Sequence, residues 1–298
     1  MKDFCGLVSI VGRPNVGKST LLNRLIEQKI SITSRKSQTT RNNILGIKTK
    51  ENHQMVFIDT PGVHINASKV MNKVLNQSAL GAIEDADLII FMLQRNKINT
   101  LDELILERLR GVETKKICVI NKLDQVASIN SLLPVIEKLR SENDFAEIIP
   151  VSAKTGKNIN ELENMICQNL PENNHLYDSD TKFLAKESFM ISEIIREKII
   201  RFLGEELPHE TYVQLQKLED KENIINIDAE IIVARESQKG IVVGKNGAKL
   251  KKIGEKARID LEKFFNKKVF LKTWVKTKKN WNNDSDFISS LGIGSLYD

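Results

Sequence analysis

The sequence contains little of what marks a secreted or disordered protein. Its 3 cysteines, Cys5, Cys118 and Cys167, lie far apart with no CxxC spacing and no histidine partner nearby. Cysteines in this number and spacing are typical of a reduced, cytoplasmic chain, and they indicate neither a disulfide framework nor a structural zinc site. Only 6 residues are proline and 15 are glycine, while 41% are hydrophobic, which excludes a collagen-like, low-complexity or largely disordered chain.

Long hydrophobic runs are also absent. A membrane-spanning helix needs about 18 consecutive apolar residues, and the densest apolar run, residues 88–93, has the length of a strand. The first apolar stretch follows an acidic residue, Asp3, and continues directly into GRPN rather than into a cleavage site of small residues. We therefore expect neither a membrane span nor a signal peptide.

Positive charge is concentrated near the C-terminus. The formal net charge is +6, but residues 239–279 alone hold 14 Lys and Arg against 3 Asp and Glu, a local excess of +11. The rest of the chain is net negative. An anionic polymer would fit this segment, although a solvated helix face beside a lysine-lined strand would give the same count.

The first half of the chain has the pattern of an α/β domain. The length of 298 residues suggests two domains at about 150 residues each. Short apolar runs alternate with helical patterns, which predicts a mostly parallel sheet with helices on both faces. Strands are expected at residues 6–11, 54–59, 87–93, 115–121 and 147–152. Helices are expected between or after them, among others at 18–27, 102–111, 132–140 and 160–170.

The second half has a different, α+β pattern after a polar stretch that we interpret as a linker. The expected boundaries are a first domain at 1–170, a linker at 171–184, a second domain at 185–280 and a tail at 281–298. The predicted order in the second domain is helix, strand, strand, short helix, long helix, strand. The five longer elements are expected at 189–203, 211–219, 224–235, 248–265 and 268–276.

A phosphate-binding loop is predicted at GRPNVGKS, residues 12–19, between an expected strand and an expected helix. Gly12 and Gly17 let backbone N–H groups approach a β-phosphate, and Lys18 adds a point charge for the β- and γ-phosphates. The Ser19 hydroxyl is a ligand for Mg²⁺. The expected nucleotide contacts here are Gly12, Arg13, Pro14, Asn15, Val16, Gly17, Lys18, Ser19 and Thr20.

Three further segments, each at the end of an expected strand, select guanine nucleotides. In DTPG, Asp59 can hold Mg²⁺ through water and the Gly62 N–H can meet the γ-phosphate. In NKLD, the Asp124 carboxylate accepts from N1–H and N2–H₂ of guanine, a donor pair that adenine lacks. In SAK, the Ala153 N–H can donate to guanine O6. The expected contacts are Asp59, Thr60, Pro61, Gly62, Val63, Asn121, Lys122, Leu123, Asp124, Ser152, Ala153 and Lys154. Parallel strands bring these segments to one edge of the sheet.

Several stretches resemble the Era family of translation-factor-type GTPases. They are GRPNVGKSTLLN (12–23), SRKSQTTRNNILG (34–46), DTPGVH (59–64) and QKGIVVGKNGAKLKKIGEKAR (238–258). The resemblance covers nearly the whole chain. It implies a P-loop GTPase domain with a mostly parallel sheet, followed by an α+β type II KH domain, whose element order is the one predicted above.

The resemblance also bears on catalysis. It implies that Thr40 closes on Mg²⁺ beside Ser19 and Asp59, with Thr39 as the alternative, and that Gly62 contacts the γ-phosphate. Val63 stands where many small GTPases have a water-orienting Gln and has no hydrogen-bonding group, so slow intrinsic hydrolysis is expected. Related GTPases hold K⁺ with an Asn at the position of Asn15. Asn15 is therefore either a K⁺ ligand in catalysis, beside Lys18, or a loop brace.

The GKNG sequence between the last two expected helices is the candidate RNA contact. A GxxG by itself is a common turn, but the surrounding positive charge and the KH element order favour a clamp on single-stranded RNA. Trp274 and Trp281, in or beside the tail VKTKKNW (275–281), are expected either to contact or stack on RNA or to serve in domain packing. The expected RNA contacts are Gly244, Lys245, Asn246, Gly247, Lys249, Lys251 and Lys252.

The function that the resemblance implies is a GTP-hydrolysing switch whose KH domain binds 16S rRNA in small-subunit (30S) assembly. It uses GTP or GDP with Mg²⁺, and K⁺ if Asn15 is a ligand. It also implies a cytoplasmic chain with some peripheral association at the inner membrane; we further expect a monomer with no DNA partner. The alternative is an RNA-binding scaffold that holds GTP without turnover. A role in tRNA modification is disfavoured because no further catalytic cluster follows residue 180.

Overall fold

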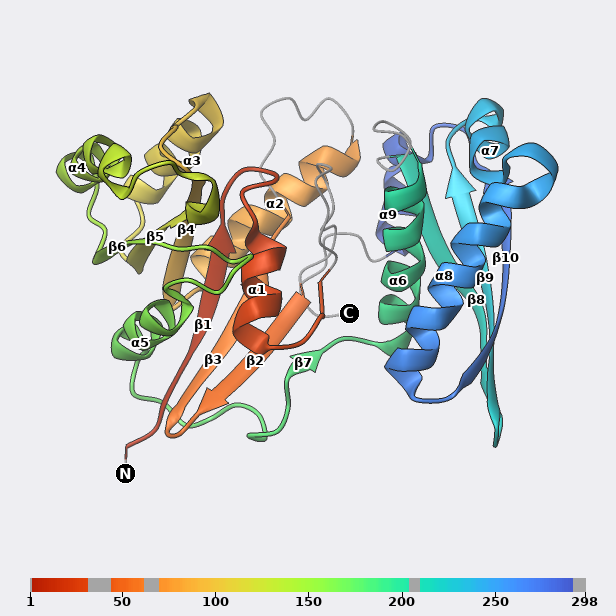
Figure 1. Cartoon of the computed structure of the whole chain (residues 1–298), viewed down its shortest axis with the longest axis horizontal. Coiled ribbons are helices and arrows are strands. Elements are labelled where there is room, and N and C mark those ends of the chain that lie inside the picture. The colour runs from red at the N-terminus through yellow and green to blue at the C-terminus, as the bar shows by residue number, and fades with distance from the viewer. Residues whose placement is uncertain (1, 32–43, 62–69, 204–209, 292–298) are drawn as a thin grey trace.

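The first domain is built on one seven-stranded sheet in the order β6-β5-β4-β1-β3-β2-β7 (Figure 1). The computed structural model describes residues 2–31, 44–61, 70–203 and 210–291. The strands are β1 (Phe4–Val11), β2 (Ile44–Lys50), β3 (His53–Asp59), β4 (Leu88–Gln94), β5 (Lys115–Asn121), β6 (Glu147–Pro150) and β7 (Phe183–Leu184). All neighbouring pairs are parallel except β2 with β3 and β7 with β2, which confirms the mostly parallel sheet.

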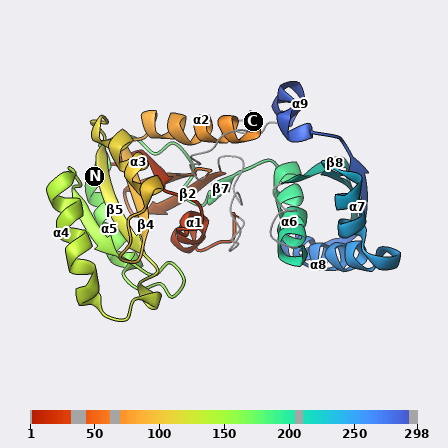
Figure 2. The same ribbon diagram turned by 90° about the horizontal axis from the view of Figure 1, so that it is seen from above.

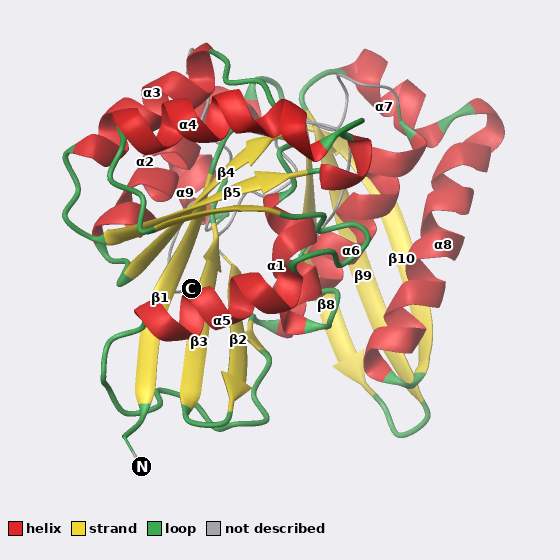
Figure 3. Ribbon diagram, turned by 60° about the vertical axis from the view of Figure 1, so that its left-hand side comes forward, coloured by secondary structure: helices red, strands yellow, loops and turns green. Residues whose placement is uncertain are grey.

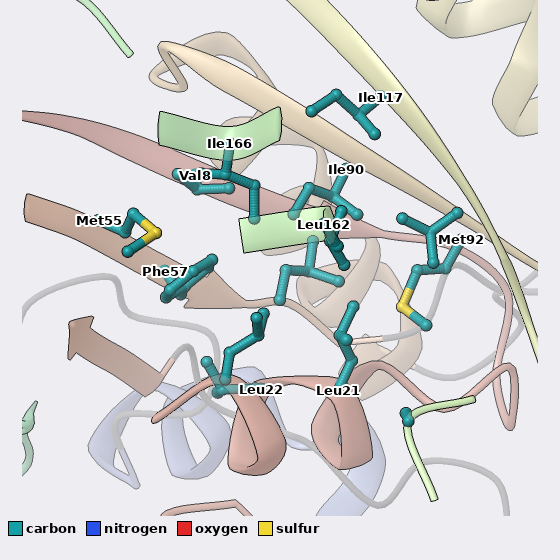
Figure 4. Packing of buried hydrophobic residues seen from close by; sticks show 14 of the residues in the cluster. Val8, Leu21, Leu22, Met55, Phe57, Ile90, Met92, Ile117, Leu162 and Ile166 are labelled. Atoms are coloured by element: carbon teal, nitrogen blue, oxygen red, sulfur yellow. The ribbon is translucent and has the colours of Figure 1, made fainter. Parts of the chain in front are cut away.

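Helices cover both faces of this sheet (Figure 3). They are α1 (Lys18–Ile26), α2 (Val70–Glu84), α3 (Thr100–Arg110), α4 (Leu133–Glu142) and α5 (Ile159–Asn169). Alternate strand residues face opposite sides, so Ile90 packs with α1 and α5 while Phe91 packs with α2, α3 and α4. Figure 4 shows Leu21 and Leu22 of α1 closing the first of these cores.

The second domain has the predicted order helix, strand, strand, helix, helix, strand. Its elements are α6 (Glu187–Phe202), β8 (Thr211–Asp220), β9 (Ile224–Val233), α7 (Glu236–Val243), α8 (Ala248–Phe265) and β10 (Lys268–Thr277). The sheet order is β10-β9-β8, with β9 antiparallel to β8 and parallel to β10. Apolar residues of α6 and α8 pack on one face of this sheet and form a separate core, which explains why the domain has its own pattern in the sequence.

A small apolar cluster joins the two domains. Met71 and Leu75 of α2 pack with the end of β9, with Trp281 and with α9 (Ser285–Ser290), which lies beside the end of α2 in Figure 2. Trp281 is fully buried, and its Nε1–H donates to the backbone oxygen of Glu210 at 3.0 Å. Of the two expectations for Trp281, packing between domains is therefore the one observed.

The segment between the domains is partly structured. Residues 183 and 184 form β7, which pairs with Leu45 and Gly46 of β2, so this segment extends the sheet of the first domain. Upstream, the amides of Leu176 and Tyr177 donate to Oε1 of Gln54 at 2.8 and 3.0 Å. Within the described ranges, no helix is both long enough and apolar enough to cross a bilayer.

Candidate functional site

The loop after β1 has the geometry of a phosphate cradle. Lys18, the first residue of α1, is only 6% exposed, and its Nζ donates to the backbone oxygens of Gly12 at 3.0 Å and Arg13 at 3.3 Å. The ammonium therefore lies inside the loop. Burial lowers the pKa of Lys18 to about 8, and the charge of Asp59 opposes this shift. A negatively charged phosphate at this position would favour the charged ammonium.

Glycine is required at Gly17 on two grounds. Its φ is +109°, a conformation that side chains rarely adopt, and a Cβ there would lie 2.3 Å from Nδ2 of Asn121. The loop thus passes directly against Asn121. The same amide, Nδ2 of Asn121, donates to the backbone oxygen of Val16 at 2.8 Å, which ties the loop to the end of β5.

The two described residues predicted to hold magnesium lie together. The Ser19 hydroxyl donates to Oδ2 of the buried Asp59 at 2.8 Å, while Thr60 Oγ1 donates to the backbone oxygen of Ile10 at 2.8 Å. A hydroxyl beside a carboxylate at the mouth of a phosphate loop fits Mg²⁺, which prefers oxygen ligands and keeps several waters. The predicted residues Thr40, Gly62 and Val63 lie outside the described residues.

The guanine-selecting segments meet at the ends of β5 and β6. The Ser152 hydroxyl donates to Oδ1 of Asp124 at 2.6 Å, which orients the carboxylate predicted to read the base. The Ala153 amide, predicted to donate to guanine O6, donates here to Oδ1 of Asn121 at 3.0 Å. Asn121 therefore links the phosphate loop, β5 and the loop after β6.

Lys122 bridges the base side and the phosphate side. Its Nζ donates to the backbone oxygen of Asn15 at 2.7 Å and to Oε1 of Gln94 at 2.6 Å. Burial lowers the pKa of Lys122, and the positive charges of Arg95 and Arg13 lower it further. Lys122 contacts the backbone oxygen of Asn15. The side chain of Asn15 is exposed and takes no part in this contact.

Four supporting side chains of the site were not predicted from the sequence. The first is Asp102 of α3, which is buried and accepts from Nε of Arg13 at 3.0 Å; Arg13 itself was expected only as a nucleotide contact. Ser31 donates to Oδ2 of Asp59 at 2.7 Å, and Arg24 Nη2 donates to the backbone oxygen of Lys154 at 2.7 Å. The missed partners are Asp102, Ser31, Arg24 and Gln94. Each lies far along the chain from the group it contacts, and no local motif marks such a pair.

The GKNG loop presents bare backbone between α7 and α8. Gly244 and Gly247 have φ of +71° and +77°, and a Cβ on Gly247 would meet no atom within 4 Å. The space over Gly247 is therefore open to a ligand. Lys245, Lys251 and Lys252 are exposed, and Lys249 and Asn246 are part of the same loop and helix start. Nζ of Lys252 also lies 5.4 Å from the ring centroid of Phe202, a cation–π contact.

The first domain is that of a P-loop GTPase, because one edge of its sheet carries a phosphate loop, a Ser–Asp pair for magnesium and the guanine-selecting loops. The second domain, with GxxG between two helices, is a type II KH domain. Family models agree: one described as "50S ribosome-binding GTPase" matches residues 7–122, and one described as "KH domain" matches residues 206–282.

The chain belongs to the Era family, and it is a GTPase. It is 46% identical over 292 residues to GTPase Era of Haemophilus influenzae, covering 98% of this chain and 97% of that protein. It is also 46% identical to GTPase Era of Coxiella burnetii over 290 residues, covering 97% of this chain and 98% of that protein.

Two solved structures are similar over nearly the whole chain. One is Era in complex with MgGDPNP and nucleotides 1506–1542 of 16S ribosomal RNA, with a TM-score of 0.94 and 36% identity, covering 97% of this chain and 99% of that one. The other is a point variant of Aquifex aeolicus Era bound to GDP·AlF₄⁻, with a TM-score of 0.93 and 36% identity, covering 98% and 99%. The expected family resemblance and fold class are thus confirmed.

Proposed function

We propose that this protein is a GTP-driven switch that binds 16S rRNA through its KH domain during assembly of the small ribosomal subunit. One observation carries the proposal: the structure of Era in complex with MgGDPNP and nucleotides 1506–1542 of 16S ribosomal RNA matches 97% of this chain at a TM-score of 0.94. The phosphate loop and the GKNG loop described above supply the chemistry for the two ligands.

The nucleotide would lie along the carboxyl-end edge of the first sheet. Lys18 and the loop amides would contact the phosphates, and Ser19 with Asp59 would hold Mg²⁺. Asp124, oriented by Ser152, would accept from the two guanine donors. A site built to pair with these donors rejects adenine because the base would leave the carboxylate without its two donors. The magnesium ion would neutralise charge on the phosphates, and the residues position it.

For hydrolysis, we propose that Thr40 and Gly62 close on the γ-phosphate and that Asn15 holds K⁺. Two observations support the part given to Asn15. Its backbone carbonyl already braces the loop through Lys122, so the side chain is not needed for that task, and this side chain is exposed. A cation here would supply the charge that Val63 cannot.

The potassium proposal is tested by measuring GTP turnover in K⁺ and in Na⁺ at equal ionic strength. We expect faster turnover in K⁺, and loss of that difference in Asn15→Ala with GDP affinity nearly unchanged. Equal rates in the two salts, with and without RNA, would remove the proposal.

Turnover that rises on addition of the rRNA fragment supports a switch, whereas tight GTP retention without turnover would support a scaffold.

The RNA contact is tested at Gly247, where a side chain would enter open space. Gly247→Asp places a negative charge where a phosphate would approach, so RNA binding should be lost while GTP binding remains. Gly247→Ala is the matched control, because it has the same positive φ without the charge, and it should weaken binding less. If folded Gly247→Asp binds RNA like the parent, GKNG is an ordinary turn.

Location and assembly state are the finer parts of the proposal. We propose that the protein is cytoplasmic and associates only peripherally with the inner membrane, as the family resemblance implies, and that it is a monomer. Light scattering gives the mass in solution, and flotation with anionic vesicles tests membrane association. Recovery of the protein with the vesicles only at low salt would be the expected peripheral behaviour.

A further inference from the structure

The outer face of the edge strand β10 carries a regular alternation of lysine and aromatic side chains. Val269 and Val275 of β10 are buried in the core against the helices. Successive residues of a strand point to opposite faces, so the even-numbered residues of β10 face away from the helices. We call this set the β10 outer stripe; it consists of Lys268, Phe270, Lys272, Trp274 and Lys276.

Phe270 is unusual in its exposure. At 57%, it is the most exposed of the large hydrophobic side chains in the described part of the chain, and it is the only aromatic residue among those exposed ones. Its register partner on β9 is Asn226, which offers no apolar surface to cover the ring. A single exposed apolar residue needs no explanation, but this one lies between two lysines on an ordered strand.

The second aromatic residue of the stripe is held in a fixed orientation. Nε1–H of Trp274 donates to Oε1 of Glu230 on β9 at 2.9 Å. Lys276 Nζ lies 3.7 Å from the same oxygen, and Lys272 Nζ lies 5.9 Å from the centroid of the Trp274 ring. Lys276 thus balances the charge of Glu230. Asp228, the register partner of Lys272, lowers the excess of positive charge along the stripe further.

The stripe lies on the opposite face of the sheet from GKNG, but at the edge nearest to it. β10 is an edge strand, and both α7 and α8, the helices that flank GKNG, contact it. In Figure 1, β10 lies at the outer border of the second domain, next to α7 and α8. A strand of RNA that leaves the GKNG loop on the helix side would therefore have to turn around the single edge strand β10 to reach the outer stripe.

We propose that the β10 outer stripe is a second contact surface for single-stranded RNA, which rests on the proposed function of the GKNG loop. One base would stack on Phe270 and another base, farther along the RNA, on the Trp274 face, while the lysines at every fourth residue, about 13 Å apart, would meet phosphates. Aromatic residues between lysines suit single strands because every base has a stacking face and every linkage a negative charge.

The test compares two RNA probes in fluorescence anisotropy with the full chain. The long probe is the 16S rRNA segment 1506–1542 of the Era complex. The short probe is a piece of about six nucleotides, enough for the four that a GxxG loop clamps. Phe270→Ala should weaken the long probe about 5- to 100-fold, the range for loss of one stacked base, and leave the short probe unchanged. Phe270→Tyr should restore binding.

The matched control is Ile259→Ala, an exposed apolar residue of α8 in the same domain at 38% exposure, and it should change neither affinity. A second readout is tryptophan fluorescence, because a base stacked on Trp274 quenches it; this quenching should be absent with the short probe and in Trp274→Phe.

The outcomes separate the two proposals. If the parent binds neither probe, or Gly247→Asp binds both, the proposed function of the loop fails. If Gly247→Asp loses both probes but Phe270→Ala binds the long probe as the parent does, the second surface is wrong. The lysines of β10 would then serve only to keep the strand edge from pairing with other chains.

Discussion

Nζ of Lys29 lies 2.6 Å from Oε2 of Glu197, and this ion pair joins the first domain to α6 of the second. Lys29 stands two residues before Ser31, whose hydroxyl contacts Asp59 in the magnesium site. The Glu197 side chain is buried and also accepts from Lys198 at 3.1 Å. A contact between domains is thus only a few residues from the nucleotide site.

Glu197→Gln should destabilise the protein. Removing the carboxylate leaves the buried Lys198, among the residues that the structure describes, with Asp260 as its acidic partner. Breaking a fully buried pair costs about 3–5 kcal/mol, and we expect about 2 kcal/mol here because Lys29 is half exposed and Asp260 remains. Urea unfolding measures this free energy. Arg201 Nη2 also pairs with Oε1 of Glu197 at 2.6 Å, but the Arg201 side chain is 52% exposed. Arg201→Gln is therefore the control and should cost less than about 1 kcal/mol; equal costs for the two variants would contradict this assignment.

The same cluster predicts an acid-dependent loss of stability. Burial alone would raise the pKa of Glu197, but the hydrogen bonds and charges of Lys29 and Lys198 outweigh it and hold this pKa below its ordinary value. Such a group stabilises the fold above its ordinary pKa of about 4.3, and the contribution disappears as the pH falls through the lowered pKa. The difference in Tm between the parent and Glu197→Gln should therefore narrow below about pH 4. A difference in Tm that stays constant from pH 7 to pH 3 would contradict the assignment of a lowered pKa to Glu197.

Nucleotide affinity should fall in alkaline solution because of Lys18. Its pKa is about 8 in the nucleotide-free protein, and bound phosphates would raise it. Below pH 8 the ammonium is already present, so affinity is flat. Above pH 8 binding must take up a proton, and the affinity for GDP should drop by at most about tenfold per pH unit. Titrations with a fluorescent GDP analogue from pH 7 to 9.5 measure this. Lys18→Met should bind weakly at every pH, and a flat profile for the parent would refute the prediction.

Asp124→Asn should exchange base specificity. The amide can donate to the C2 carbonyl of xanthine, whereas it cannot accept from both guanine donors as the carboxylate does. We expect GTP affinity to fall by about 100-fold or more and XTP to become the better ligand. Competition binding with GTP and XTP is the measurement. Unchanged GTP affinity would remove the guanine-site assignment, and Lys18→Ala should weaken both nucleotides equally.

Trp281→Ala should loosen the junction between domains. The indole is fully buried against Met71 and Leu75, so its truncation should cost about 3–5 kcal/mol of unfolding free energy. Trp274→Ala is the matched control. Its ring is on the outer face of a sheet, and its loss should cost about 1 kcal/mol. Chemical unfolding followed by circular dichroism compares them. Equal costs would mean that Trp281 does not hold the domains together.

The sequence predicted best what is local. Gly12 to Ser19, the NKLD segment and the GKNG loop are short motifs at element ends, and the helix–strand order of the second domain followed from its alternating patterns. The strands β1, β3, β4 and β5 were expected within two residues of their observed ends. These elements are buried on both faces, so their apolar runs are continuous and easy to recognise.

What the sequence did not predict depends on distant contacts. Strand β2 went unrecognised because Gly46 and its lysines break the apolar run; Gly46 is nonetheless fixed there, since a Cβ would lie 2.9 Å from Leu22 and Ile30. Helix α2 and strand β7 were also not expected. The roles of Trp281 and of the Arg13–Asp102 pair depend on residues far along the chain, which no spacing rule brings together.

The pairing of β7 with β2 limits how the two domains can move. β7 ends at Leu184 and α6 begins at Glu187, so only Ala185 and Lys186 lie between an anchored strand and a packed helix. Two residues span at most about 7 Å. While β7 stays in place, the second domain can turn about this short pivot but cannot move away from the first. A wider separation would require β7 to detach from Leu45 and Gly46 and expose the edge of β2.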